Sequence, residues 1–208
     1  KHLCETYGLT IEDIRSQNNY ALRWASDGGH IKVVKYLCET YKLTIEDIRS
    51  NDNYVLRRAS ENGHIEVVKY LCETYGLTSE DILSDNNCAL VWASKNGHIE
   101  VVKYLCETYQ LTIENIRSDD NYALKLACKN GHIEVVKYLC ETYKLTIEDI
   151  RSDDNFALRW ASRNGHIEVV KYLCETYKLT IEDIRSWDNE ALIWASLNGH
   201  IEVVKYLC

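Results

Sequence analysis

The sequence contains no proline and no methionine, and it holds a single phenylalanine among its 208 residues. It also lacks the alternation of apolar and polar residues that predicts a half-buried β-strand. Because proline is the strongest helix breaker, its absence together with the missing alternation predicts a chain of α-helices and tight turns. A chain without methionine does not begin at a start codon, so we expect it to be a piece of a longer array.

The chain also lacks an excess of positive charge and a long apolar run. Its 24 basic and 32 acidic residues give a net charge of −8 and a pI of about 5.4. A general nucleic-acid binder would show clustered basic residues and a pI above about 9, so we expect no nucleic-acid partner. No apolar run approaches the roughly 20 residues of a membrane-spanning helix, so we expect no membrane partner.

What the sequence does contain is a repeat with a fixed period of 34 residues. A period of this size predicts a solenoid, because each unit is too small to bury its apolar face without its neighbours. Two residue types mark the period throughout, and they are His30, His64, His98, His132, His166 and His200, and Cys4, Cys38, Cys72, Cys106, Cys140, Cys174 and Cys208. We treat residues 1–208 as one array with repeats at 17–50, 51–84, 85–118, 119–152, 153–186 and the incomplete 187–208, and with 1–16 as the tail of a preceding repeat.

Each repeat predicts two helices followed by a short third one, as the unit 153–186 illustrates. Asn155 is a suitable N-cap for a first helix, which the pair Asn164-Gly165 would end. The run from His166 to Tyr177 predicts a second, amphipathic helix. The segment Thr180-Ile-Glu-Asp183 is a variant of the capping box and predicts a short third helix.

The recurring cysteines lie in the apolar arc of the second helix, which predicts small buried side chains. Equivalent positions of stacked helices lie about 8–10 Å apart, whereas a disulfide needs Cα atoms within about 7 Å. We therefore expect free thiols, which suit a reducing intracellular compartment such as the cytoplasm, whether of the organism itself or of a host cell. The same spacing prevents the sulfurs from sharing one metal ion, and we expect no metal site and no cofactor.

The recurring histidines follow the glycine that ends each first helix. A side chain at this turn is expected to bond to the backbone between the helices. The alternative use of the cysteines, a thiol sensor, requires at least one thiolate that reacts rapidly in the folded protein.

The run Asn164-Gly-His-Ile-Glu-Val-Val-Lys-Tyr-Leu173, which follows Ala157-Leu-Arg-Trp-Ala-Ser162, resembles the ankyrin repeat, and the resemblance recurs six times. The Thr-Pro-Leu-His motif of that family is absent, and Phe156-Ala-Leu-Arg159 stands in its place. The resemblance implies an all-α, ankyrin-like α-solenoid of about six stacked helix-turn-helix repeats, with a short third helix in place of the hairpin finger. This 34-residue variant is similar to arrays common in amoebae and in giant viruses.

The repeats differ from one another mainly at five positions, which are Gln17, Tyr20, Arg23, Trp24 and Asp27 in the first of them. The last four are spaced i, i+3, i+4 and i+7 and so share one face of the first helix. The resemblance implies that the first helices line a concave surface where partners bind. We therefore predict a protein-binding site rich in the residue types of interface hot spots, formed by Tyr20, Arg23, Trp24, Arg57, Arg58, Trp92, Lys125, Arg159, Trp160, Trp187 and Trp194.

This strip of side chains changes character along the array. Arg23, Arg57, Lys125 and Arg159 make it locally basic, and the last repeat makes it apolar, so we expect an unidentified protein partner with an acidic segment and an apolar end. Arg58 stands one repeat from both Trp24 and Trp92, an arrangement that predicts cation–π contacts. The alternative is that the tryptophans mainly pack between repeats, or that the positions vary neutrally.

The leading functional prediction is a non-catalytic scaffold for protein–protein interaction. No nucleophile with a base, no phosphate loop and no paired acids are visible, so we assign no catalytic residue and do not expect an enzyme. The alternative is a structural spacer or self-assembling array without a dedicated ligand. The chain would then assemble end to end rather than remain a monomer.

Overall fold

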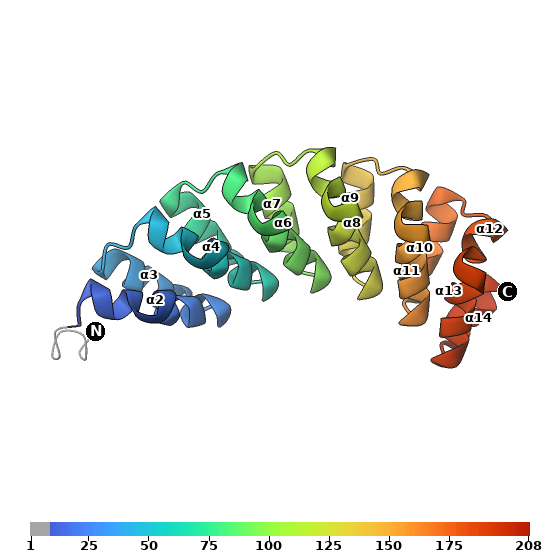
Figure 1. The fold of residues 1–208 in the computed structure, drawn as a ribbon, viewed down its shortest axis with the longest axis horizontal. Helices are drawn as coiled ribbons and strands as arrows, with labels where there is room; N and C mark the ends of the chain where they lie inside the picture. Colours follow the sequence, from blue (N-terminus) through green and yellow to red (C-terminus); the bar gives the residue numbers. More distant parts are fainter. Residues whose placement is uncertain (1–8) are drawn as a thin grey trace.

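The computed structural model describes residues 9–208, and within them it contains only helices and the turns between them (Figure 1). The first helices of the repeats are α2 (Ile11–Asp27), α4 (Ile45–Glu61), α6 (Ser79–Lys95), α8 (Ile113–Lys129), α10 (Ile147–Arg163) and α13 (Ser186–Leu197). The second helices are α3 (Ile31–Thr40), α5 (Ile65–Tyr75), α7 (Ile99–Thr108), α9 (Ile133–Thr142), α11 (Ile167–Tyr177) and α14 (Ile201–Leu207), and α12 (Ile181–Ile184) precedes α13. The predicted all-α solenoid is confirmed, whereas Cys4 and the first half of the tail 1–16 lie outside the described residues.

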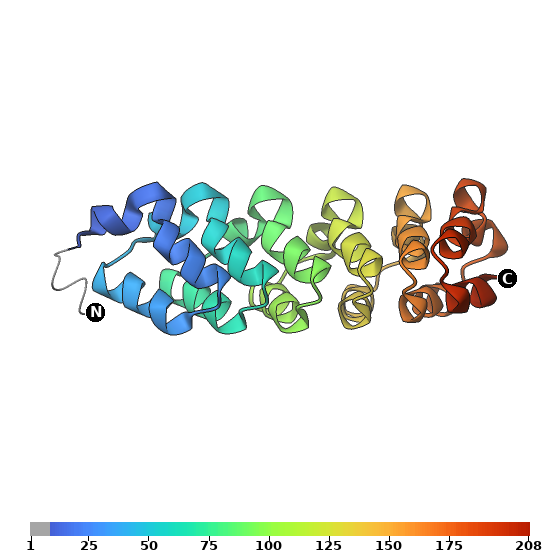
Figure 2. The ribbon, with the colours of Figure 1, turned by 90° about the horizontal axis from the view of Figure 1, so that it is seen from below.

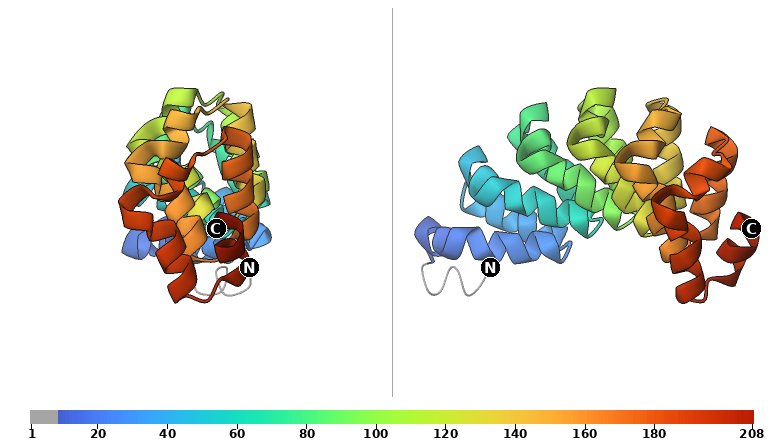
Figure 3. Two further views of the ribbon diagram at one scale, coloured as in Figure 1. Left: turned by 90° about the vertical axis from the view of Figure 1, so that its right-hand side faces the viewer. Right: turned by 45° about the vertical axis from the view of Figure 1, so that its right-hand side comes forward.

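The helices form two parallel rows. Each first helix packs against the second helix of its own repeat and against the first helices on either side. Figure 2 shows the two rows from below, with the first helices in the upper row and the second helices in the lower. The views in Figure 3 show the same two rows along the array and obliquely.

The array bends within the plane of Figure 1, which corrects one expectation. The row of first helices faces the viewer, and the inner edge of the arc carries the turns that join first to second helices. The first helices therefore form a side of the arc and do not line its hollow. The reason is the asymmetry of the two edges, because glycines at the inner edge let adjacent repeats approach closely, while an extra helical turn separates them at the outer edge.

That extra turn begins with the predicted capping box. The backbone N–H of Thr44 donates to Asp47 Oδ2 at 2.8 Å, and Thr180 does the same with Asp183. The short third helix is confirmed, and in the repeat 153–186 it stands alone as α12. In α4 it runs into the following first helix through the left-handed residues 51–53, whose φ angles are 54°, 56° and 55°. Asn and Asp adopt this conformation more readily than other residues with a Cβ.

The prediction that Asn155 caps a helix is wrong. Its φ is 61°, and its side-chain oxygen has no hydrogen-bond partner. The equivalent Asn19 shows what this position does, since its Nδ2 donates to the carbonyl of Asp47 and to Ser50 Oγ, each at 3.1 Å. Asn19, Asn53 and Asn87 therefore bond to the first turns of the following first helix, as Asn19 of α2 does to α4.

The core repeats with the same period as the sequence. Each first helix except α13 contributes a leucine that is almost fully buried, and these are Leu22, Leu56, Leu90, Leu124 and Leu158. As predicted, the recurring cysteines Cys38, Cys72, Cys106 and Cys140 are buried among apolar side chains, and the cysteines of the described chain are free thiols.

The recurring histidines bond to the backbone, as predicted. Nε2 of His64 lies 2.8 Å from the carbonyl oxygen of Asp27, and Nε2 of His166 lies 3.0 Å from that of Lys129. Each ring thus contacts the turn of the preceding repeat, and burial lowers the pKa of His166. These histidines connect repeats along the inner edge of the arc.

Slow alkylation of the buried cysteines is the first testable prediction. Burial raises the pKa of Cys72, Cys106 and Cys140 to about 11, so little thiolate is present at neutral pH. We expect iodoacetamide at pH 7.5 to modify these three at least about 100-fold more slowly in the folded than in the unfolded protein. Peptide mass spectrometry measures each site, with the exposed Cys208 as internal reference. Rapid modification of any of the three would instead support the thiol sensor.

Candidate binding face

The predicted binding residues lie on the outward side of the first-helix row, which we call the variable face. Most of their side chains contact a neighbouring repeat, either the next one or the preceding one. Arg57 bonds to Asp85, which lies 28 residues further along the chain, and Arg23 lies over the ring of Tyr54, which lies 31 residues further. Asp27 bonds to Arg58, also 31 residues further along. The variable face is therefore a series of junctions between neighbouring repeats.

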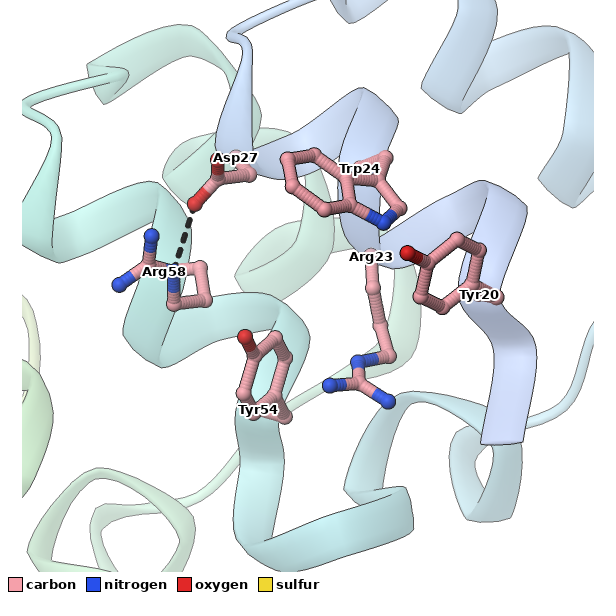
Figure 4. Close-up of a pocket in the computed structure, with 6 residues that line it drawn as sticks. All are labelled: Tyr20, Arg23, Trp24, Asp27, Tyr54 and Arg58. Carbon is pink, nitrogen blue, oxygen red and sulfur yellow. Dashed lines mark hydrogen bonds and ion pairs between the residues drawn. The ribbon is translucent and has the colours of Figure 1, made fainter. Parts of the chain in front are cut away.

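The junction between α2 and α4 contains a small pocket of about 60 Å³, shown in Figure 4. The guanidinium of Arg23 lies 3.8 Å from the ring centre of Tyr54. On the other side of the pocket, Arg58 Nε bonds to Asp27 Oδ1 at 2.6 Å. Trp24 is 57% exposed, so the pocket has an aromatic rim open to solvent.

The expected cation–π contacts occur, but not at Arg58. This residue binds Glu61 at 2.6 Å in addition to Asp27, because two carboxylates within reach attract a guanidinium more strongly than an aromatic face does. The residues 9–208 show no ring contact of Arg58 with Trp24 or Trp92. Cation–π contacts between repeats that involve tryptophan lie instead at later junctions, where Lys129 Nζ is 4.0 Å from the Trp160 ring and the Arg163 guanidinium is 4.1 Å from the Trp194 ring.

The basic character expected of the strip is largely neutralised. Arg57 pairs with Asp85 at 2.9 Å. Lys125 is only 5% exposed and lies 3.4 Å from Asp153, and Arg159 is only 8% exposed and pairs with Glu190. Of the four predicted basic residues, Arg23 alone forms no ion pair within the described chain.

The physical reason is the offset between adjacent repeats. A long side chain on one first helix reaches the left-handed turn within the next one, where the sequence places acidic residues such as Asp85 and Asp153. Ion pairing with these acids satisfies the cations and leaves them little free charge for a partner.

A larger hollow of about 340 Å³ lies between α6 and α8. Val91, Trp92, Tyr122 and Leu126 give it an apolar lining. Acidic and basic side chains stand at its two ends, because Asp85 and Asp119 lie at the left-handed turns within α6 and α8, while Lys95 and Lys129 are the last residues of these helices. The hollow thus combines apolar surface with a change of charge along its length.

Cys88 borders the same hollow, but its chemistry is unfavourable for a nucleophile. Its Sγ donates a hydrogen bond to Asp85 Oδ2 at 3.2 Å. Burial, followed by this bond, raises the pKa of the thiol. A thiolate nucleophile needs a lowered pKa, so the residue fits a structural role.

The last repeat is the most apolar part of the variable face. Trp187 and Ile193 are exposed, and Leu197 is 69% exposed. Trp194 is half-buried, with its Nε1 donating to Glu190 at 2.8 Å. The tryptophans therefore divide between exposed positions and positions packed between repeats, and their role in binding stays a prediction.

Sequence analysis missed the matching of residues across the junctions. The signal was present in the sequence as complementary residues 28, 31 or 32 apart, such as Asp27 and Arg58. No single repeat reveals such a pair, since its two members belong to different units.

Two further chemical features are absent from residues 9–208. No group of three or more His, Cys, Asp or Glu side chains there is arranged to hold a metal ion. In the same residues, no helix has both the length and the apolar character needed to cross a membrane.

The sequence matches a known protein family. The family model described as ankyrin repeats (3 copies) matches residues 1–82, 41–117, 75–149, 109–184 and 145–208, and these matches together span the chain. None of the curated proteins compared with the chain matches it.

Proposed function

The chain belongs to the ankyrin-repeat family, whose repeats are generally protein–protein interaction modules, and from this premise we propose that it is a non-catalytic scaffold that binds a protein on its variable face. The proposed working environment is a reducing intracellular compartment, in keeping with the buried thiols. The predicted contact residues remain candidates. Lys125 and Arg159 are buried, so they would support the binding surface from beneath and not touch the partner directly.

The observation that supports this face best is the hollow between α6 and α8. Its apolar lining and its volume of about 340 Å³ suit one large apolar side chain of a partner. Lys95 and Lys129 favour an acidic residue beside that side chain, and Asp119 favours a basic residue on the opposite side. The proposed partner segment therefore carries an apolar anchor residue with an acidic residue on one side and a basic residue on the other. This description is more specific than a partner with an acidic segment and an apolar end.

A peptide-display selection tests the proposal. Replacing Trp92 by Gln and Tyr122 by Ser removes most of the aromatic lining, and a central hot spot contributes about 2 kcal/mol or more. We expect the selected peptides to carry an aromatic or aliphatic anchor and to bind the double variant at least about 10-fold more weakly. Isothermal titration calorimetry measures the dissociation constants.

Tyr138→Ser, on the second-helix row, is the matched control and should leave the affinity unchanged. Thermal unfolding establishes that each variant is folded. Peptides that bind the double variant as tightly as the original chain would refute the proposed location.

A further inference from the structure

Three successive first helices end in a basic residue whose charge is not paired. Lys95, Lys129 and Arg163 are the last residues of α6, α8 and α10, and each is partly exposed. Within residues 9–208, none of their side chains forms an ion pair, in contrast to Arg57, which binds Asp85 at 2.9 Å. We call these three residues the cationic row.

The position at the end of a helix does not explain the row. A cation there is favoured by the helix dipole and an acid is disfavoured. Asp27 and Glu61 nevertheless stand at the same position in α2 and α4, where both are bonded to Arg58. The residue type at this position therefore follows what the side chain meets, and the side chains of the cationic row meet tryptophan rings.

These rings hold the cations in place without removing their charge. Lys129 Nζ lies 4.0 Å from the ring centre of Trp160, and Lys95 Nζ lies equally close to a tryptophan of its own helix. The guanidinium of Arg163 lies 4.6 Å from the ring centre of Trp160 and 4.1 Å from that of Trp194. Because a ring contacts the face of a guanidinium, the N–H donors at its edge stay free for a carboxylate.

The carboxylate beside Arg163 is already engaged. Glu190 lines the same small pocket as Arg163. It accepts hydrogen bonds from Arg159 and from Nε1 of Trp194, the latter at 2.8 Å. Arg163 therefore keeps its donors for a ligand.

The spacing of the row limits what can bind along it. Neighbouring helices pack about 8–10 Å apart, which sets the distance between Lys129 and Arg163 at equivalent positions of α8 and α10. An extended peptide advances about 3.3 Å per residue, so carboxylates three residues apart match these two cations. Lys95 and Lys129 also border the hollow between α6 and α8, which has an apolar lining. A peptide offers an apolar anchor together with carboxylates, whereas a nucleic-acid backbone offers charge alone.

We propose that the cationic row binds an extended acidic segment of the protein partner, which continues along the array from the hollow. The inference rests on the proposed function, because the segment starts at the apolar anchor seated in that hollow. A first carboxylate, directly after the anchor, binds Lys129 with Lys95 beside it. A second carboxylate, three residues later, binds Arg163. Since tryptophan rings already position the cations, little side-chain freedom is lost on binding.

Fluorescence anisotropy with a labelled synthetic peptide tests the proposal. The probe carries a lysine, a leucine anchor, a glutamate directly after the anchor and a second glutamate three residues further on. We expect replacement of the second glutamate by glutamine to weaken binding about 5-fold at low salt, as for a partly exposed charge pair with good geometry. Arg163→Gln should weaken binding of the original probe by the same factor.

Lys144→Gln is the matched control and should leave the affinity unchanged. Lys144 is an exposed cation at the outer edge of the array, and Gln110 stands at the equivalent position one repeat earlier. The control removes the same charge as a variant of the cationic row would, without touching the row.

Exchanging the charges provides the decisive measurement. Arg163→Glu should weaken binding of the probe at least about 10-fold, because two carboxylates then face each other. A probe with lysine in place of the second glutamate should bind this variant more tightly than it binds the original chain, which a folding defect could not produce. Glu61 shows that a glutamate is compatible with the end of a first helix.

Four outcomes would overturn the proposal. They are a probe that does not bind the original chain at low salt, a second glutamate whose replacement has no effect, a charge exchange without recovery, and a control variant that weakens binding as much as Arg163→Gln. Displacement of the probe by single-stranded oligothymidine would also overturn it, since the row would then bind a nucleic acid.

The double variant of Trp92→Gln and Tyr122→Ser separates this proposal from the proposed function. If it weakens binding of the probe while Arg163→Gln does not, the hollow binds the anchor and the inference about the row is wrong. If it has no effect while the charge exchange succeeds, the row binds an acidic segment and the proposed place of the anchor is wrong.

Discussion

Replacing Leu90 by alanine is expected to lower the free energy of unfolding by about 2–5 kcal/mol, the range for removing a buried leucine side chain. Leu90 is 1% exposed and lies on α6, in the middle of the array. In a solenoid each repeat is coupled only to its neighbours, so a weak central repeat should separate the unfolding of the two halves. Urea unfolding monitored by tryptophan fluorescence should change from one transition to two.

Leu192→Ala is the matched control, since Leu192 occupies the same place in the last repeat and is only partly buried. We expect it to cost less and to leave a single main transition, because only the end of the array is weakened. A Leu90→Ala protein that unfolds like the original would show that Leu90 does not pack as the structure describes.

The local structure could be predicted from the sequence because its determinants lie within one repeat. The capping box of Thr180 and Asp183, the helix-ending Gly165 and the apolar arc of the second helix are each encoded over a few residues. The fixed period then implies that neighbouring repeats bury equivalent leucines such as Leu90. These features required no knowledge of how one repeat is placed on the next.

The direction of bending and the surroundings of the long side chains depend on that placement. Asn155 is of a residue type that commonly caps helices, yet it lies in a left-handed turn, and the equivalent Asn19 of α2 bonds across to α4. Arg159 looks like a surface cation from its helical position, yet Glu190 lies 31 residues further along and pairs with it. Sequence reasoning within one helix cannot give this offset, because helix packing sets it.

For the candidate site, the sequence correctly indicated which positions differ but not what the differences accomplish. At least part of the variation matches residues across junctions, as the pair of Asp27 with Arg58 and the pair of Lys129 with Trp160 illustrate. The residues around the hollow between α6 and α8 leave apolar surface unused. Partner binding is therefore to be sought where the contacts between repeats leave apolar surface or charge unused.

The second large effect is expected at the turns of the inner edge. Gly131 has a φ of +79°, where a residue with a Cβ is strained, and a Cβ atom there would overlap the ring of His166. Gly131→Ala should therefore cost about 1–3 kcal/mol from backbone strain alone, and more once the ring is displaced. Displacement would also break the contact of His166 Nε2 with the Lys129 carbonyl, now 3.0 Å.

Two comparisons separate strain from the steric effect. Gly199→Ala shares the positive φ, at +74°, but no atom lies near its Cβ, so it should show the strain alone. In a double-mutant cycle, Gly131→Ala should cost less when His166 is already alanine, because the overlap has gone. If the losses of unfolding free energy in the two single variants are additive, the His166 ring moves aside without an energetic cost. The glycine would then be required only for its backbone angle, and the close approach of repeats at the inner edge would not depend on the absence of its side chain.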